Sequence, residues 1–219
     1  MNTKTKKAAP VKRATHQVRI IGGQWKRTPL NVIDAEGLRP TPDRVRETAF
    51  NWLNHLFDGN WAGVSCLDLF AGSGALGFEA ASRGARQVSM VEAHTPALRQ
   101  LEQVKQKLNA SQVSLLRGDA LKCAASLAAQ GQRFTLIFLD PPFKLDWLAK
   151  ILPLCGGLLD EHGLLYVEAE HLLTDSRVEG SAPAWMAGWR VIRADQAGSV
   201  FFHILQRSIL LPDTHENQA

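Results

Sequence analysis

From residue 64 onward, short apolar runs alternate with amphipathic segments in a regular order. The apolar runs predict strands over residues 65–70, 87–92, 112–117, 134–140, 163–168, 189–194 and 200–206. The segments between them predict helices over 75–83, 95–109, 120–129 and 145–154. Strands that alternate with helices form a mostly parallel sheet covered on both faces, so the predicted fold class is α/β. Only residues 195–199 join the last two strands, which predicts a hairpin and an antiparallel last strand at or near an edge.

The chain before this alternation is more polar. Residues 1–15 predict a disordered tail, and the sequence around Gly22 and Gly23 predicts two short strands, over 18–21 and 24–27, with a third extended piece over 30–33. Thr41 is expected to cap a helix over 43–57, with Pro42 in its first turn. The predicted organisation is a tail (1–15), a β-hairpin extension (16–40), a main domain (41–208) and a loose C-terminal tail (209–219).

Positive charge is concentrated at the N-terminus. Residues 1–46 hold 11 Lys and Arg against 3 Asp and Glu, a net charge of +8, whereas the rest of the chain holds 14 against 18, a net charge of −4. A basic arm on a mildly acidic body indicates a polyanionic partner such as RNA or DNA. A tail that only improves solubility would explain residues 1–15 equally well, but it explains the apolar and aromatic residues over 19–46 less well.

Composition excludes several other classes of protein. No apolar run approaches the roughly 20 residues of a membrane span, and the polar, lysine-rich start lacks the apolar core of a secretory signal. Three widely spaced cysteines exclude a disulfide scaffold and a zinc cluster. These features predict a cytoplasmic protein without a metal.

The first strand of the alternation ends in a glycine-rich turn over residues 68–74, Asp-Leu-Phe-Ala-Gly-Ser-Gly. Glycines let the backbone approach a ligand closely and turn sharply into the following helix. Dinucleotide, phosphate and nucleoside binders all use such a turn. The spacing of Gly72, Gly74 and Gly77 also fits a Rossmann dehydrogenase.

Acidic residues after the next strands favour a nucleoside ligand. Glu92 ends the second strand, about 20 residues after the turn, where it can accept hydrogen bonds from both ribose hydroxyls. Asp119 follows the third strand, where it can accept from the exocyclic amine of adenine or simply cap the next helix. Asp140 follows the fourth. Because the C-terminal ends of parallel strands share one rim of a sheet, these features together predict one ligand site.

The segment 140–143, Asp-Pro-Pro-Phe, is the most specific of these features. Its prolines lack an N–H and fix φ, so the Pro141 carbonyl and the Asp140 carboxylate remain free to accept hydrogen bonds. Together these acceptors suit a planar NH₂ group with two donor hydrogens. Phe143 can stack on a base ring, a contact that contributes about 1–3 kcal/mol. The alternative interpretation is a rigid turn with a buried phenylalanine.

This segment resembles the motif of S-adenosylmethionine-dependent amino-methyltransferases, which modify exocyclic amines of bases or a glutamine amide. Over residues 19–207 the chain resembles one branch of that class, the bacterial 16S rRNA guanine-N2 methyltransferases of the RsmD type. The matching segments are 19–25, 38–47 (Leu-Arg-Pro-Thr-Pro-Asp-Arg-Val-Arg-Glu), 68–74 and 140–143, of which the second is the most branch-specific. The chain departs from the family at Lys26-Arg27, where a glycine near Arg27 is common.

The resemblance implies a Rossmann-like class I methyltransferase fold with a seven-stranded, mostly parallel sheet and a small N-terminal hairpin. The implied reaction transfers the methyl group of S-adenosylmethionine to N2 of guanine 966 in 16S rRNA, by a monomer acting on the assembling 30S subunit. The predicted catalytic residues are Asp140, Pro141, Pro142 and Phe143. The predicted cofactor contacts are Asp68, Phe70, Gly72, Ser73, Gly74, Glu92, Asp119, Ala120 and Asp140. The predicted RNA contacts are Arg19, Trp25, Lys26, Arg27, Arg39, Arg44 and Arg46, and the last three could instead contact the cofactor carboxylate.

Other functions stay open at this point. A DNA adenine or cytosine methylase or a protein-glutamine methylase would share the Asp-Pro-Pro-Phe segment, although residues 61–208 leave no room for a separate DNA-recognition domain. A non-catalytic RNA-binding module could retain a nucleoside pocket. An NAD-dependent oxidoreductase fits less well, because no hydride-transfer constellation accompanies the glycine-rich turn.

Overall fold

The structure, a computed structural model, describes residues 17–32, 41–143, 146–174 and 182–208. The predicted tails over 1–15 and 209–219, and the predicted RNA contact Arg39, lie outside these described residues. Within the described ranges, the structure contains no helix whose length and apolar character would let it cross a membrane.

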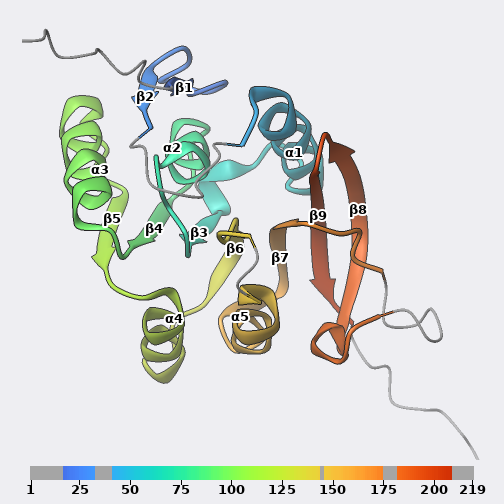
Figure 1. The fold of residues 1–219 in the computed structure, drawn as a ribbon. Coiled ribbons are helices and arrows are strands. Elements are labelled where there is room, and N and C mark those ends of the chain that lie inside the picture. The colour runs from blue at the N-terminus through green and yellow to red at the C-terminus, as the bar shows by residue number, and fades with distance from the viewer. Residues whose placement is uncertain (1–16, 33–40, 144–145, 175–181, 209–219) are drawn as a thin grey trace, which may run out of the picture.

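A seven-stranded sheet forms the centre of the molecule, in the order β5-β4-β3-β6-β7-β9-β8 (Figure 1). β3 to β7 run parallel to one another, whereas β9 runs antiparallel to both β7 and β8. The α/β fold with an antiparallel last strand beside the edge is therefore confirmed. The strands are β3 (Ser65–Asp68), β4 (Gln87–Glu92), β5 (Val113–Arg117), β6 (Phe134–Leu139), β7 (Leu159–Ala169), β8 (Trp189–Ala197) and β9 (Val200–Arg207).

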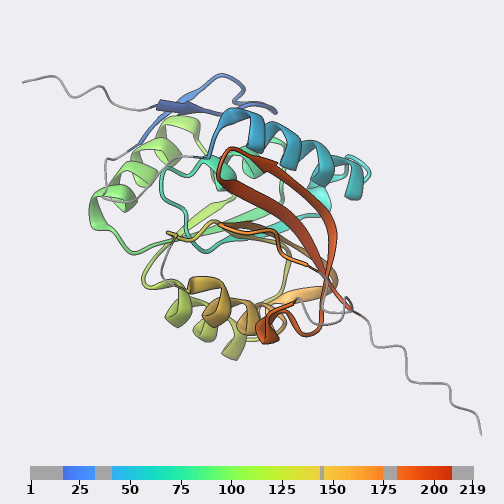
Figure 2. The ribbon, with the colours of Figure 1, turned by 45° about the vertical axis from the view of Figure 1, so that its right-hand side comes forward.

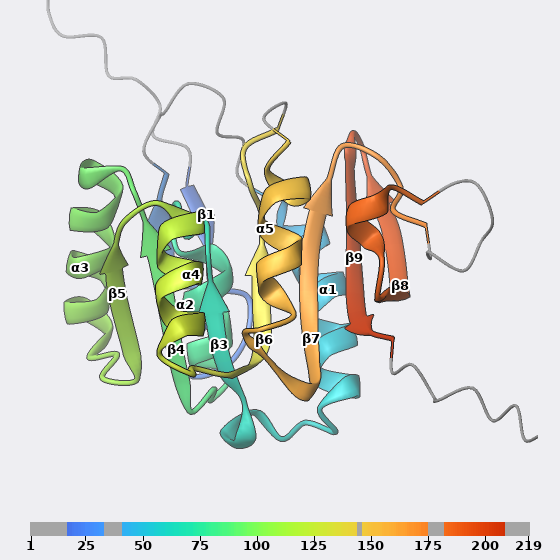
Figure 3. The ribbon, with the colours of Figure 1, turned by 90° about the horizontal axis from the view of Figure 1, so that it is seen from below.

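Helices cover both faces of this sheet (Figures 1 and 3). One apolar cluster packs α1 (Asp43–Leu56), α2 (Ala75–Ser82) and α3 (Thr95–Leu108) on one face, and a second packs α4 (Ala120–Ala129), α5 (Trp147–Cys155) and the short helix η2 (Ala184–Met186) on the other. A further short helix, η1 (Trp61–Gly63), leads into β3. The layer with α1 extends over β9 (Figure 2), where Trp52 stacks on Phe202 with ring centroids 5.3 Å apart. Burial on both faces explains why these strands are continuously apolar.

The N-terminal hairpin is present, but its second strand was predicted wrongly. β1 (Gln17–Arg19) pairs antiparallel with β2 (Pro29–Asn31), so that Val18 lies opposite Leu30. Residues 24–27 are not a strand, because their backbone closes turns instead: the N–H of Lys26 donates to Gly23 at 3.3 Å. The third extended piece of the sequence analysis is thus the true partner strand.

The hairpin turn docks onto α2. Backbone groups in this turn hydrogen-bond to the helix and so do not pair with a neighbouring strand. The N–H groups of Ile21 and Gly22 both donate to the Glu79 carboxylate, at 2.6 and 2.9 Å. The N–H of Gln24 donates to the carbonyl of Ser82 at 2.8 Å. Gly23 has φ +72°, and a Cβ there would lie 1.9 Å from that same carbonyl oxygen. Only a glycine lets the turn approach the helix this closely.

Thr41 does not cap α1, contrary to the sequence prediction. The cap position is Pro42, which has no side-chain donor or acceptor, and no side chain caps this end of the helix. The hydroxyl of Thr41 is instead turned toward the sheet, where it contacts two carboxyl groups. Thr41, which the sequence analysis predicted to cap the adjacent helix, therefore contacts residues far away in the sequence.

Candidate functional site

The predicted site residues converge at one rim of the sheet. Asp68, Glu92 and Asp140 end or follow β3, β4 and β6, and Asp119 follows β5; these four strands are neighbours. The chain segments beyond the strand ends stay close together: the N–H of Ala71 donates to the β4 carbonyl of Val91 at 3.0 Å. The structure therefore brings the glycine-rich turn and the acidic strand ends into a single cluster, as the topology predicts.

The glycines of the turn and of the start of α2 are required for different reasons: backbone conformation, close packing or access for a ligand. Gly74 has φ +81°, and a Cβ there would lie 2.5 Å from the ring of Phe78. A Cβ on Gly77 would lie 2.8 Å from Met90, so this residue allows α2 to pack on β4. Gly72 has φ +52° but faces open space, since its nearest neighbour is a backbone oxygen 4.0 Å away. Gly72 is thus the position at which the backbone is left accessible to a ligand, and Ser73 beside it is half-buried.

Glu92 is tied to the glycine-rich turn. One carboxylate oxygen accepts from the N–H of Gly72 at 2.8 Å, and the other accepts from the N–H of His94 at 2.7 Å. A carboxylate offers about four acceptor positions, two on each oxygen. Each oxygen of Glu92 therefore keeps an acceptor position, which is the arrangement that two adjacent hydroxyl donors require. The sequence did not predict the contact between Glu92 and the turn.

Asp68 is a buried carboxylate beneath the turn. It accepts hydrogen bonds from the N–H groups of Phe70 at 3.3 Å and Gly77 at 3.2 Å. Burial, followed by the nearby charges of Asp140 and Glu92, raises the pKa of Asp68 to about 7, although the two N–H donors oppose the shift. A carboxyl group that titrates near neutral pH at a ligand rim is typical of a functional site.

Phe70, Asp119 and Ala120 have structural roles in this site. The ring of Phe70 packs edge-on against that of Trp147 at the start of α5, with ring centroids 5.3 Å apart. Asp119 caps α4, with its carboxylate accepting from the N–H of Lys122 at 3.1 Å, and Ala120 is buried in the first turn. The helix-capping alternative for Asp119 is thus present, and its contact with adenine stays a prediction.

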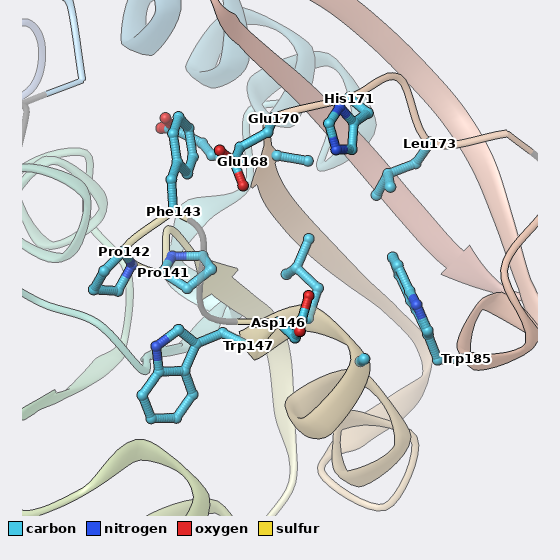
Figure 4. Close-up of a pocket in the computed structure, with 13 residues that line it drawn as sticks. Pro141, Pro142, Phe143, Asp146, Trp147, Glu168, Glu170, His171, Leu173 and Trp185 are labelled. Carbon is cyan, nitrogen blue, oxygen red and sulfur yellow. The ribbon is translucent and has the colours of Figure 1, made fainter.

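A pocket with a cavity volume of about 130 Å³ opens beside the Asp-Pro-Pro-Phe segment. Its walls come from the residues after β6, the start of α5, the end of β7 and η2. Figure 4 shows Phe143 and Glu168 on one side of the pocket and Trp185 on the other. Aromatic rings and acceptor groups around an open space suit a planar base. The sequence analysis placed Pro141, Pro142 and Phe143 at the site but missed the wall from β7 and Trp185, because that wall depends on strand order.

A hydrogen-bonded cluster surrounds Asp140. The hydroxyl of Thr41 lies 3.0 Å from a carboxyl oxygen of Asp140 and 2.8 Å from one of Glu168, and the hydroxyl of Tyr166 lies 2.8 Å from that same Glu168 oxygen. Burial raises the pKa of Asp140 to about 6, although hydrogen bonds from Thr41 and Glu168 oppose the rise. Burial and the neighbouring Asp140 raise the pKa of Glu168 well above its usual range. Thr41, Tyr166 and Glu168 were missed by sequence reasoning.

The predicted RNA contacts divide into exposed and buried residues. Lys26, Arg27 and Arg44 are exposed, and Trp25 is half-buried against the core. Arg27 has φ +71°, a left-handed conformation that glycine adopts more readily than arginine. Arg19 is exposed and pairs with Asp43 at 2.8 Å.

Arg46 is a correction to the predicted RNA contacts. Its side chain is fully buried, with one guanidinium nitrogen bonded to Asp43 at 2.6 Å and another donating to the carbonyl of Arg19 at 2.8 Å. A guanidinium in this position cannot reach an RNA phosphate. Arg46 instead joins α1 to the N-terminal hairpin, and we remove it from the set of RNA contacts.

Comparison with known proteins gives a consistent set of relatives. The sequence profile of a family described as conserved hypothetical protein 95 matches residues 18–206. The ribosomal RNA small subunit methyltransferase D of Escherichia coli K12 is 39% identical over 87% of this chain and 90% of its own length. That of Haemophilus influenzae is 40% identical over 72% of this chain and 81% of its own length. A solved structure, the putative methyltransferase yhhF from Escherichia coli, is 38% identical with a TM-score of 0.70, over 88% of this chain and 98% of its own. The chain therefore belongs to the ribosomal RNA small subunit methyltransferase D family.

Proposed function

We propose that this protein transfers the methyl group of S-adenosylmethionine to N2 of guanine 966 in 16S rRNA, acting as a monomer on the assembling 30S subunit. The observation that carries the proposal is the place of Asp140. Its carboxylate lies within electrostatic reach of Asp68 on the side of the glycine-rich turn, and it directly precedes the prolines that line the aromatic pocket. The names of the relatives support rRNA as the substrate.

The residues present fit S-adenosylmethionine. The open backbone beside Gly72 leaves room for the methionine part of the cofactor, and Glu92 keeps one acceptor position for each ribose hydroxyl. Burial and, after it, repulsion from the Asp140 and Glu92 carboxylates raise the pKa of Asp68. A cationic ligand relieves that repulsion. When bound, the cofactor supplies a methyl group on a positively charged sulfur.

Asp140 and the Pro141 carbonyl act on the amine that receives the methyl group. The N2 lone pair of guanine is delocalised into the ring, so the amine is a poor nucleophile. Two acceptors that hold both N–H groups orient this lone pair toward the methyl group, and fixed acceptors of this kind are an effective form of catalysis. As the N2–C bond forms and the S–C bond breaks, N2 loses one proton. A carboxylate whose pKa is about 6 can hold this proton near neutral pH.

The pocket beside Asp140 accommodates the target base. A guanine must leave its stack to reach this rim, as in other enzymes that modify bases. Phe143 and Trp185 offer ring surfaces for stacking, which contributes about 1–3 kcal/mol per base, and Glu170 adds a carboxylate to the wall. Exposed Lys26, Arg27 and Arg44 are available to contact phosphates around the flipped base.

The test is methyl transfer from labelled S-adenosylmethionine to defined acceptors. Substrates are 30S subunits and deproteinised 16S rRNA from cells that lack this protein, with duplex DNA as the alternative. We expect label in 16S rRNA, mapped by mass spectrometry to N2 of guanine 966. Transfer to DNA, or to another base, would contradict the proposal.

Asp140→Ala should lower transfer by about 10²–10⁴-fold, the range expected for removal of a general base. Cofactor binding should change little, since Asp68, Glu92 and the glycine-rich turn remain. Asp195→Ala, which removes an exposed carboxylate from β8, is the matched control. Transfer by Asp140→Ala at the rate of this control would show that Asp140 has no part in the reaction.

A further inference from the structure

The cluster around Asp140 is assembled by the strand register. β6 and β7 pair in parallel with Leu139 opposite Val167, so the next residues along, Asp140 and Glu168, are brought side by side at the rim. Tyr166 lies two residues before Glu168 and so points to the same face of β7. Thr41 reaches the pair from the segment before α1. Three separate parts of the chain thus meet at two carboxyl groups.

The hydrogen bonds among Thr41, Asp140 and Glu168 together require a proton on one of these carboxyls. The Thr41 hydroxyl has a single hydrogen, yet its oxygen lies 3.0 Å from Asp140 and 2.8 Å from Glu168. Thr41 can donate to only one of them. Asp140 and Glu168 also hydrogen-bond to each other, and a hydrogen bond between two carboxyl groups needs a hydrogen on one of them. Two ionised carboxylates around one hydroxyl would leave an unscreened repulsion in a buried place.

The proton belongs on Glu168. Its side chain is buried, with 2% of the residue exposed, whereas Asp140 is partly exposed at the rim. Burial disfavours the charged form, so the more buried acid stays neutral. With the proton there, Tyr166 donates to Glu168 in a chain of hydrogen bonds, and both Glu168 and Thr41 donate to Asp140. The chain ends on Asp140, which keeps the negative charge.

The charged and titratable groups that act on this cluster agree with that assignment. Arg46 of α1 favours the ionised forms of Glu168 and Tyr166, but burial is the largest influence on both and outweighs it. Asp68 of β3 interacts electrostatically with Asp140, and their repulsion opposes a further negative charge. The stable state of the Asp140–Glu168 pair therefore carries one negative charge, on Asp140, with Glu168 neutral.

We propose that Glu168 is a positioning residue for Asp140: it acts as a buried neutral acid that, together with Thr41, fixes the Asp140 carboxylate in its ionised form with an acceptor oxygen toward the amine. The role rests on the proposed function, because Asp140 is the group that meets the substrate. Loss of the donor would leave Asp140 free to rotate and easier to protonate. Either change removes the acceptor for the N2–H group.

The proposal is tested by changing the hydrogen-bonding capacity of Glu168 at nearly constant shape. Glu168→Gln is permanently neutral and still donates, whereas Glu168→Leu cannot donate. We expect Glu168→Leu to lower kcat by about 100-fold, the loss that follows a misplaced catalytic group, with unchanged affinity for S-adenosylmethionine. Glu168→Gln should restore most of that loss. Glu161→Gln, an exposed residue at the opposite end of β7, is the matched control.

The pH profile separates positioning from a merely structural role. The hydrogen bonds from Thr41 and Glu168 lower the pKa of Asp140, so their loss should move the acidic limb of kcat to higher pH. This shift is expected in Glu168→Leu and in Thr41→Val, and it should be absent in Glu168→Gln. If Glu168→Leu fails to fold, the pH profile is measured on Thr41→Val, which removes the hydrogen bond from Thr41 to Asp140. A parent-like profile in Thr41→Val, or equal losses in Glu168→Gln and Glu168→Leu, would overturn the proposal.

Infrared spectroscopy tests the protonation state without any substrate. At pH 8 the parent protein should show the C=O stretch of a protonated carboxylic acid, which disappears in Glu168→Gln. Absence of this band from the parent would overturn the proposal even if methyl transfer is observed. Conversely, a parent that shows the band but transfers no methyl group to 16S rRNA would contradict the proposed function and leave the neutral Glu168 intact.

Discussion

Asp68 shows how burial prepares a single residue for a cationic ligand. Its described hydrogen-bond partners are two backbone N–H groups, and the neighbouring carboxylates Glu92 and Asp140 oppose its ionisation. Because the folded pKa of about 7 lies above the model-peptide value of 3.8, folding favours the protonated form. The ionised form therefore costs stability in full above pH 7; this cost shrinks as the pH falls from 7 towards 3.8 and is absent below 3.8. A bound cation reverses the preference.

Binding of S-adenosylmethionine should consequently depend on pH. We expect affinity to be greatest above pH 7 and to fall by up to about tenfold per pH unit below it, as one proton must be released on binding. Asp68→Asn should bind more weakly at pH 8 and lose most of this dependence. Calorimetric titration between pH 5.5 and 8.5 measures both effects, with the exposed Asp58→Asn as control. An unchanged slope in Asp68→Asn would assign the proton to another group.

The sequence predicts the role of a residue when that role depends on its neighbours in the chain, and fails when it depends on distant residues. Asp140 could be found because its meaning is local: an acid stands directly before two prolines. Thr41 could not, because its partners Asp140 and Glu168 are 99 and 127 residues away. Local chemistry favoured a helix cap for Thr41, and the long-range contact prevailed. Arg46 failed for a related reason, since nothing in the spacing of the basic residues distinguishes a buried arginine from an exposed one.

Among the elements, strands and helices from β3 onward were predictable, whereas the N-terminal hairpin was only partly so. β4 and α4 match their predicted bounds, because apolar runs bounded by glycine, acids and amides identify buried strands and their helices. The hairpin register depends on an external partner, Glu79 of α2, which binds the N–H groups of Ile21 and Gly22. A glycine pair predicts a turn but carries no information about the helix onto which the turn docks.

Gly23→Ala should release the hairpin from α2. The new Cβ would lie 1.9 Å from the carbonyl oxygen of Ser82, and the backbone has φ +72°. Gly59→Ala is a matched control, because Gly59 has φ +71° with nothing within 4 Å. The control should lose about 1–2 kcal/mol of stability from the left-handed backbone alone, and Gly23→Ala should lose more. Denaturant unfolding measures both. Equal losses would mean that docking on α2 contributes nothing to stability.

Over the whole molecule, the cofactor site and the proposed RNA-binding segment differ in charge: the N-terminal residues 1–46 are basic, and the rest of the chain is mildly acidic. The cofactor rim and the base pocket are built by residues 68–185 of the described chain, where carboxylates are concentrated. The net charge of +8 lies over residues 1–46 instead. An acidic rim suits a cationic cofactor but repels phosphates. Binding of RNA must then depend on the basic N-terminal arm and on exposed cations such as Lys26, Arg27 and Arg44.

Deletion of residues 1–15 tests this division across the molecule. The segment holds five Lys and Arg residues, and each phosphate contact contributes about 0.7 to the slope of log affinity against log salt for single-stranded RNA. The slope should therefore become shallower by up to about 3.5, while affinity for S-adenosylmethionine stays the same. Deletion of residues 209–219, which contain no Lys or Arg, is the control of similar length. RNA binding measured between 50 and 300 mM salt gives both slopes. Equal slopes in the two deletions would assign the RNA contacts to the folded surface rather than to the tail.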